Sequence, residues 1–299
     1  MGRIITDLQD RFKRGSIFIQ LIFINVGVFA LTALVSIFFQ LFNRSAAGVI
    51  QLFELPSSFS RFLSQPWSIF TYMFMHADIL HILFNMLWLY WFGSMFLYFF
   101  SAKHLRGLYI LGGICGGVLY MVSYNIFPYF ENSVLVSTMV GASASILAIV
   151  IATAYREPNY PIRLFLFGTL RLKYIAIIVI LMDLLFLTSG NAGGHIAHLG
   201  GALAGLWFAA SLNKGKDPTA WINKAIDWVL SLFERKTWQK KKRAKMKVHY
   251  SEKAKDYDYN AQKKAQSEEI DRILDKLKKS GYNSLSTEEK KSLFDASKR

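Results

Sequence analysis

Three short stretches of an otherwise apolar sequence hold the side chains that hydrolytic chemistry needs. They lie in residues 74–85, 141–145 and 194–201. Within them fall four of the six histidines of the chain, namely His76, His81, His195 and His198. A serine hydroxyl becomes a nucleophile when a histidine accepts its proton, and the oxyanion of acyl transfer needs preplaced donors. Serine and histidine together with Asn85 therefore predict acyl-transfer chemistry.

Helical spacing refines the positions of these groups. His81 and Asn85 are four residues apart and share one helix face, so both, with the backbone N–H of Ser143, can stabilise an oxyanion. His76 lies half a circle away from Asn85 and is expected to be mainly structural. No acidic residue is placed as a third reacting group, and Asp183 is expected to cap an outer loop or bond a neighbouring helix. We therefore predict a Ser–His dyad whose imidazole is oriented by packing.

The composition indicates which class of protein positions these groups. The 299 residues are 53% hydrophobic and 18% charged, and roughly two-thirds of the 35 Lys and Arg residues follow residue 212. A segment so apolar and poor in charge is solvated by a bilayer and excludes a soluble enzyme or a disordered chain. The net charge of +15 lies largely in the tail, so we expect a lipid bilayer and no nucleic acid as partner. The single Cys115 excludes a disulfide scaffold and a cysteine-based metal site.

Hydrophobic runs long enough to cross a bilayer predict an all-α membrane protein with six transmembrane helices. The expected spans are 16–41, 70–98, 106–127, 134–154, 173–189 and 194–212. Basic residues alternate between the loops, which places both termini in the cytoplasm. Spans two, four and six then all enter from outside, and their polar clusters can meet in the outer half. Ser143 would lie about seven residues into its span, roughly 10 Å below the surface.

The sequence divides into three parts. Residues 1–15 are a cytoplasmic segment, 16–212 the membrane domain, and 213–299 a basic cytoplasmic tail with an amphipathic helix and a small helical hairpin. In the tail, Gly281 fits a helix end, and Ser286 with Glu289 forms a capping box for a last helix. Residues 43–68 form an outer loop too apolar for a connector, expected to lie in the interface as short helical pieces.

Small residues predict close contacts between the membrane helices. The glycines at 112, 113, 116 and 117 form overlapping GxxxG pairs, and Gly201 with Gly205 forms another. His198 lies on the face of Gly201 and Gly205, so its helix should press against a neighbour, which we expect to be the fourth span.

At residues 16–212 the sequence resembles the rhomboid intramembrane serine proteases, in their six-span bacterial form. The matching motifs are His76-x4-His81-x3-Asn85, Gly141-Ala142-Ser143, and Ala197-His198-x2-Gly201-x3-Gly205. The resemblance implies that Ser143 is the nucleophile and His198 the general base, with Asn85 and His81 at the oxyanion site. His76, His195 and Gly141 are candidates for supporting positions around them. It further implies endopeptidase cleavage of the transmembrane segments of membrane proteins near the outer face, without cofactor or metal.

Three positions depart from the family pattern. Ala144 replaces the usual glycine after the nucleophile, Leu147 replaces a frequent tyrosine, and Trp67 is followed by Ser68 instead of arginine. None of these changes removes a reacting group. The added methyl group of Ala144 is the one that could crowd the site.

Two other functions remain open. A catalytically inactive rhomboid-like protein would bind membrane helices without cutting them, although both Ser143 and His198 are retained. A histidine-based metal transporter or metalloprotease is less well supported, because the chain lacks HExxH and no carboxylate accompanies the histidines. The six-span form and the lack of a transit peptide favour the bacterial plasma membrane as the location.

Overall fold

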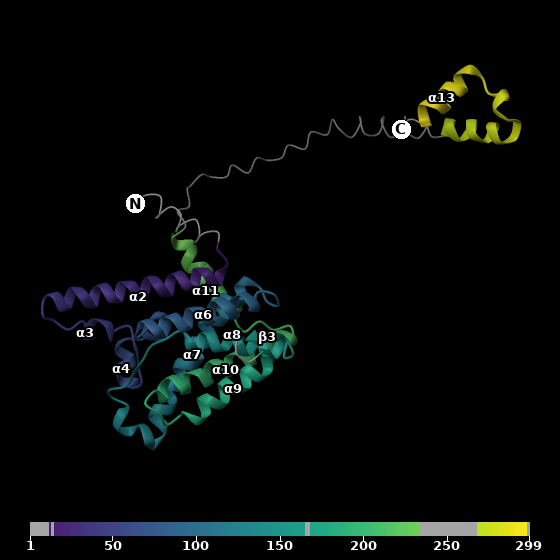
Figure 1. The fold of residues 1–299 in the computed structure, drawn as a ribbon. Helices are drawn as coiled ribbons and strands as arrows, with labels where there is room; N and C mark the ends of the chain where they lie inside the picture. Colours follow the sequence, from purple (N-terminus) through teal and green to yellow (C-terminus); the bar gives the residue numbers. More distant parts are fainter. Residues whose placement is uncertain (1–11, 13–14, 165–167, 234–267, 298–299) are drawn as a thin grey trace. The chain divides into compact units, whose positions relative to one another are not determined.

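The computed structural model describes residue 12 and residues 15–164, 168–233 and 268–297. The chain forms two compact units, residues 1–234 and 235–299. The first unit is a helical bundle (Figure 1).

Four helices of the bundle are long and apolar enough to cross a membrane: α2 (Ile17–Leu41), α6 (Ile79–Phe96), α7 (Ala102–Ile126) and α10 (Ala192–Asn213). Two shorter helices, α8 (Ser143–Arg156) and α9 (Leu172–Leu185), correspond to the predicted fourth and fifth spans. Each has 14 residues, which is about 21 Å of helix and less than a hydrocarbon core. Six helices thus match six predicted runs, while the count of six crossings stays a prediction.

The second and fourth predicted spans begin too early. The residues ahead of α6 form α5 (Ser68–Thr71) and the short helix η1 (Tyr72–Phe74), and those ahead of α8 include the strand β2 (Thr138–Met139). The short helix η2 (Pro128–Ser133) lies just before the predicted fourth span. In the non-spanning segments Tyr72, Met73 and Met139 are apolar and pack into the protein. Hydropathy cannot distinguish a side chain covered by protein from one covered by lipid.

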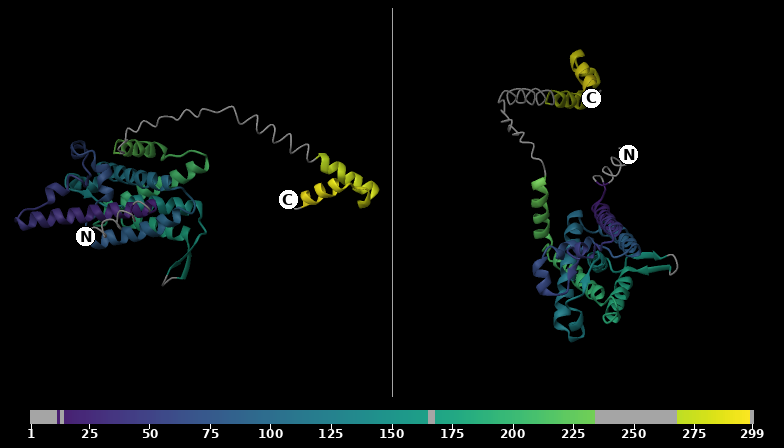
Figure 2. Two further views of the ribbon diagram at one scale, coloured as in Figure 1. Left: turned by 90° about the horizontal axis from the view of Figure 1, so that it is seen from above. Right: turned by 90° about the vertical axis from the view of Figure 1, so that its left-hand side faces the viewer.

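The prediction of an all-α fold needs a small correction. Strand β1 (Leu55–Pro56) pairs antiparallel with β2 (Thr138–Met139), and β3 (Pro161–Leu164) pairs with β4 (Gly168–Arg171) in a hairpin between α8 and α9. The hairpin projects from the bundle in both views of Figure 2. Extended backbone is possible at these places because each strand finds a partner for its peptide groups.

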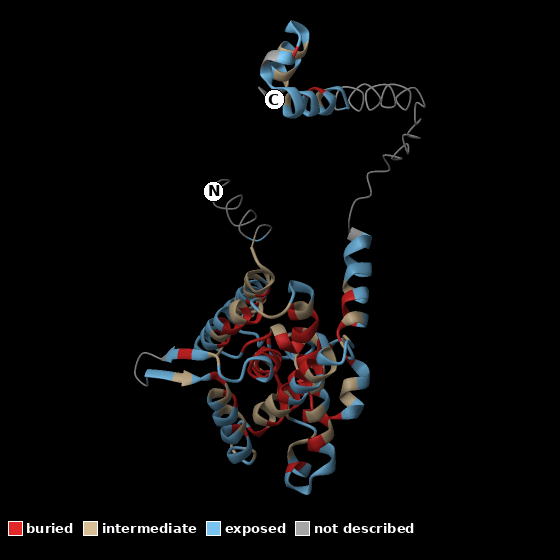
Figure 3. Ribbon diagram, turned by 90° about the vertical axis from the view of Figure 1, so that its right-hand side faces the viewer, coloured by how far each residue is buried: buried red, intermediate tan, exposed pale blue. Residues whose placement is uncertain are grey.

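Helix α8 is the centre of the bundle. Eleven of its 14 residues are buried, and it packs against α6, α7 and α10. Figure 3 shows the buried residues gathered in these central helices, whereas the β3–β4 hairpin is largely exposed. Helix α2 packs against α6, and only two residues of its 25, Leu21 and Asn25, are buried.

Glycines allow this central packing. A Cβ atom at Gly201 would meet the carbonyl oxygen of Ala144, and one at Gly205 would meet that of Ala148. From α7, a Cβ at Gly112 would meet the side chain of Ala148. The predicted contact of the His198 helix with the Ser143 helix is therefore confirmed, and so is the role of these glycines.

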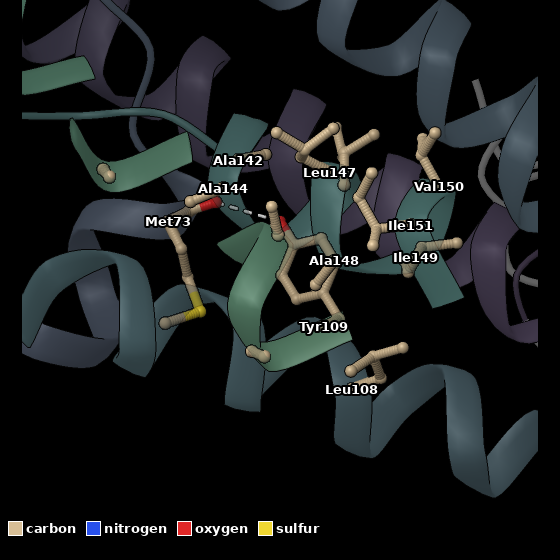
Figure 4. Close-up of a cluster of buried hydrophobic side chains, with 14 of the residues drawn as sticks. Met73, Leu108, Tyr109, Ala142, Ala144, Leu147, Ala148, Ile149, Val150 and Ile151 are labelled. Atoms are coloured by element: carbon tan, nitrogen blue, oxygen red, sulfur yellow. Dashed lines mark hydrogen bonds between the residues drawn. The ribbon is translucent and has the colours of Figure 1, made fainter. Parts of the chain in front are cut away.

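Polar groups join the irregular segments to the core. The Tyr109 hydroxyl donates to the Met73 carbonyl oxygen at 2.9 Å, in the buried cluster of Figure 4. The segment from 43 to 68 contains α3 (Ala47–Ile50) and α4 (Phe59–Ser64), which confirms its expected short helices. Trp67 Nε1 donates to the Leu52 carbonyl oxygen at 2.8 Å and so ties this segment together.

Helix α11 (Ala220–Phe233) belongs to the first unit and packs against α7. Asn223 Nδ2 donates to the Lys103 carbonyl oxygen at 3.0 Å, and Arg106 Nη2 donates to Asp227 Oδ1 at 2.7 Å. Ile222 is buried, whereas Trp221 and Trp228 are exposed, so the apolar residues of this predicted amphipathic helix divide between two faces.

The second unit contains a helix over residues 268–280, the short helix η3 (Tyr282–Ser284) and α13 (Thr287–Ser297). Gly281 ends the first helix with φ of 73°, and its N–H donates to the Leu277 carbonyl oxygen. The capping box is confirmed, since Glu289 Oε2 accepts from the Ser286 N–H at 2.7 Å and Ser286 Oγ accepts from the Glu289 N–H at 3.2 Å.

Candidate functional site

One cavity of about 760 Å³ collects most of the predicted site residues. Its walls include Ser143, His198, His81, Asn85 and Asp183. These residues come from α6, α8, α9 and α10, so the cavity lies where four helices meet. His76, His195 and Gly141 are not part of its lining.

Ser143 is the first residue of α8, not a residue one or two turns inside a span. The preceding turn depends on Gly141, which has φ of 132° and donates its N–H to the Tyr72 carbonyl oxygen at 3.0 Å. A side chain is strained in this backbone conformation. The expectation that Ser143 lies about seven residues into a helical span is thus corrected, because a non-helical segment leads up to it, while its depth stays a prediction.

The start of α8 supplies unpaired backbone donors beside the Ser143 hydroxyl. The N-cap residue, Ala142, has no side-chain oxygen, and the first helical bond runs from the Ile146 N–H to the Ala142 carbonyl. The N–H groups of the first turn therefore have no intrahelical partner and carry the positive end of the helix dipole. Such a helix end stabilises developing negative charge on a ligand.

His81 and Asn85 lie together on α6, as their spacing predicts. Asn85 Nδ2 donates to the His81 carbonyl oxygen at 3.0 Å, and the Asn85 side chain is buried at the cavity wall. His81 Nδ1 accepts from the Ala77 N–H at 3.4 Å. A neutral imidazole that accepts at Nδ1 carries its proton on Nε2, so His81 can donate from that atom.

Gly141 keeps open the space between His81 and Ser143. A Cβ atom at Gly141 would lie 2.9 Å from His81 Nε2 and 3.6 Å from Ser143 Oγ. The two side chains therefore face the same small volume, and any residue larger than glycine would enter it. This contact gives Gly141 the supporting position that the sequence predicts.

The imidazole of His198 has a carboxylate partner, which the sequence reasoning did not expect. His198 Nδ1 and His195 Nδ1 each lie 2.8 Å from the same atom, Asp183 Oδ1. Asp183 is only 4% exposed. The prediction that no acidic residue adjoins the base is therefore wrong. The expectation that Asp183 bonds a neighbouring helix is confirmed, because α9 and α10 are joined by these contacts.

His195 and His76 surround the site without lining the cavity. The ring of His195 stacks on that of Phe186 with centroids 5.8 Å apart. His76 is buried, its ring centroid lies 5.1 Å from that of His81, and both of its nitrogens lack a hydrogen-bond partner among the described residues. Contact with His81 is thus the link between His76 and the cavity.

Two of the departures from the family pattern, Ala144 and Leu147, lie in different surroundings. Ala144 is buried and does not line the cavity, because its methyl group points to the place where a Cβ of Gly116 would be. Leu147 does line the cavity. The methyl group of Ala144 therefore packs between helices and does not crowd the site.

No hydrogen bond joins Ser143 and His198 among the described residues, although both line one cavity. Catalytic hydrogen bonds in unliganded enzymes are often long and tighten when substrate binds. Among the described residues, Asp183, His195 and His198 also form a group that could hold a metal ion, since their ligand atoms lie within 4.8 Å of one another. The 2.8 Å separations are those of charge-assisted hydrogen bonds from imidazole to carboxylate.

Comparison with known proteins finds a family match in each unit. Residues 253–299 match a family of unknown function (DUF6576). The chain is 29% identical over 158 residues to "RHOMBOID-like protein 12, mitochondrial" of Arabidopsis thaliana. This match covers 50% of the chain and 47% of the relative, so the chain spans about half the length of that protein.

The helical bundle contains the longer match. The rhomboid domain family matches residues 63–214, which include α6 to α10 and every predicted site residue. Its members are mostly intramembrane serine proteases. With four helices able to cross a membrane, the protein is a multi-pass membrane protein. The chain belongs to the rhomboid family.

Proposed function

We propose that the protein is an intramembrane serine endopeptidase that cleaves transmembrane segments of membrane proteins. The observation that carries this proposal is the shared cavity, whose walls hold a serine at a helix N-terminus together with two histidines and an asparagine. A nucleophile, a base and convergent donors are the set that acyl transfer requires. An inactive rhomboid-like protein has no need to retain all of them.

The reaction follows from the positions of these groups. Ser143 Oγ attacks the carbonyl carbon of the scissile peptide while its proton passes to His198 Nε2. The oxyanion accepts hydrogen bonds from the N–H groups at the start of α8, from Asn85 Nδ2 and from His81 Nε2. His198 then gives the proton to the departing amine as the C–N bond breaks. Water attacks the acyl ester, its proton passes to His198, and the Ser143 oxygen leaves and takes that proton back.

The membrane arrangement is part of the proposal. Basic residues in alternate loops support six crossings with both termini in the cytoplasm and the cavity towards the outer face. A plasma membrane location follows the six-span form, whereas "mitochondrial" belongs to the name of the plant relative. The partners are single-span or multi-span protein substrates and the bilayer itself.

Cleavage of a single-span substrate by matched variants tests the proposal. We expect Ser143→Ala to abolish cleavage and Ser145→Ala to retain it. Ser145 lies two residues further along α8, is fully buried, and contacts Met73 Sδ instead of lining the cavity. Equal cleavage by wild type and Ser143→Ala would refute the assignment.

Two further measurements separate the other functions. A fluorophosphonate probe should label wild type and the Ser145→Ala variant but not the Ser143→Ala variant. A chelator should leave cleavage unchanged, and loss of cleavage on chelation would point to a metal at Asp183, His195 and His198. A protein that binds membrane helices without cutting them would show neither labelling nor cleavage.

A further inference from the structure

Asp183 is a buried acid that the proposed reaction has not yet used. It lies on α9, whose other buried residues are Leu172 and Ala176, while most of the helix exposes aliphatic side chains such as Ile177, Ile178 and Leu181. A carboxylate in such surroundings is costly unless it is hydrogen-bonded. Its retention in an apolar helix therefore calls for a specific partner.

The partners are two imidazoles that share one oxygen. His195 Nδ1 and His198 Nδ1 both lie 2.8 Å from Asp183 Oδ1, while Asp183 Oδ2 is buried without a partner among the described residues. A carboxylate oxygen has two lone pairs and no proton to give, so each imidazole must donate its Nδ1–H. Both sites of Oδ1 are then filled.

This arrangement determines the tautomer of His198. With the proton held on Nδ1, the other nitrogen, Nε2, keeps a free lone pair and is the atom able to accept a proton. Of the two histidines, only His198 lines the cavity with Ser143. His195 instead stacks on Phe186 and occupies the second lone pair of Asp183 Oδ1.

We propose that Asp183 is a positioning residue that holds His198 as the Nδ1–H tautomer and aims Nε2 into the cavity, with His195 fixing the carboxylate from its other side. The inference rests on the proposed function. It replaces a dyad oriented by packing with a base oriented by a buried carboxylate. Asp183 does not touch the substrate in this scheme, because it acts through His198.

The main test is the kinetics of Asp183→Asn with a single-span substrate. An amide can donate to Nδ1 and so favours the opposite tautomer, which in a serine protease of another fold lowers kcat about 10⁴-fold. We expect kcat to fall by about 10²-fold or more with KM little changed, and Asp183→Glu to recover part of it. His195→Gln should give a smaller fall in kcat.

Asp217→Asn is the matched control. Asp217 Oδ2 lies 3.6 Å from His104 Nε2 in another acid–histidine pair of the same bundle, away from the cavity. This variant should retain wild-type kcat. A kcat for Asp183→Asn within twofold of wild type, in protein where Ser143→Ala is inactive, overturns the positioning role alone. Activity in Ser143→Ala overturns the proposed function instead.

A spectroscopic measurement decides the matter even if Asp183→Asn fails to fold. The ¹⁵N chemical shifts of labelled histidine, assigned by comparison with His198→Gln, report which ring nitrogen carries the proton. We expect the Nδ1–H tautomer for His198 in the full-length wild-type protein. An Nε2–H tautomer there contradicts the proposal.

Discussion

Among the described residues, the bundle contains two acid–histidine clusters, and they differ in how far the carboxylate is buried. In the cavity, Asp183 is 4% exposed and receives two imidazole donors at 2.8 Å. Beside α11, Asp217 lies 3.6 Å from His104, and both side chains are partly exposed. The two carboxylates therefore differ in burial, whereas the histidines are similarly exposed, at 25% for His104 against 20% for His195 and 22% for His198.

The two clusters also do different things to the backbone. The Asp217 carboxylate accepts from the Thr219 N–H at 2.8 Å, just ahead of α11, and so holds a helix start. Among the described residues, the Asp183 carboxylate accepts instead from two side chains, those of His195 and His198. Exposed polar contacts contribute little energy, and those of Asp217 locate α11. In the proposed mechanism the buried carboxylate of Asp183 instead orients the base.

The largest expected difference between the clusters is the loss of a base. His198→Gln should lower kcat/KM for a single-span substrate by at least about 10⁴-fold, because the serine loses its proton acceptor. His104→Gln is the matched change in the cluster of Asp217, and its kcat/KM should stay within about twofold of wild type. Cleavage assays with both variants at equal protein level measure this. Similar losses of kcat/KM for the two variants would contradict the assignment of His198, and not His104, as the base.

The next effect concerns the oxyanion donors. Asn85→Ala should lower kcat about 10²- to 10³-fold with a small change in KM, as for removal of one preorganised donor. Asn223→Ala is its control, since Asn223 donates to the Lys103 carbonyl oxygen between α11 and α7. If Asn85→Ala changes KM and not kcat, Asn85 binds substrate in the ground state and does not stabilise the transition state.

Much of the fold and part of the candidate site could be predicted from the sequence. The periodicity and hydropathy of the chain predict the six helices, and the spacing of Gly201 and Gly205 predicts the contact between α8 and α10, because both signals are local. The grouping of Ser143, His198, Asn85 and His81 in one cavity also agrees with the predicted topology. The capping box of Ser286 and Glu289 was predicted from four consecutive residues.

The remainder depends on contacts between segments that no local pattern encodes. Asp183 was recognisable as an acid in an apolar run, but its two partners lie 12 and 15 residues away, across a turn. The start of α8 at Ser143 was missed because the residues ahead of it are apolar without being helical. The β1–β2 pair joins residues 55–56 to 138–139. Strands of two residues are too short to show a pattern from which this pairing could be predicted.

A smaller effect is expected where helices are pressed together behind the cavity. Gly201→Val should lower the free energy of unfolding by about 1–3 kcal/mol, because the added side chain meets the Ala144 carbonyl oxygen. Gly27→Val, on α2, is the control, since nothing lies within 4 Å of a Cβ there. Thermal unfolding in detergent compares the two. Equal stabilities would mean that α8 and α10 can separate without cost.

The smallest expected effect is the pH dependence of the ion pair that joins α11 to α7. The hydrogen bond from Arg106 lowers the pKa of Asp227 below its usual 3.8, with a further contribution from Lys103. A carboxyl whose pKa is lower when folded stabilises the fold at higher pH and loses that contribution as pH falls through the folded value. Hydrogen exchange of α11, corrected for intrinsic rates, should therefore show protection that declines only below about pH 4.

Asp227→Asn is the control for the hydrogen-exchange measurement on α11. Without the carboxylate, α11 should be slightly less protected at neutral pH and should show no decline as acid is added. Because Asp227 is about half exposed, salt should reduce the difference between the variants as well. Cleavage activity should be the same in both at neutral pH, since this ion pair locates α11 and does not reach the cavity. A steep acid loss that persists in Asp227→Asn assigns the transition to another group.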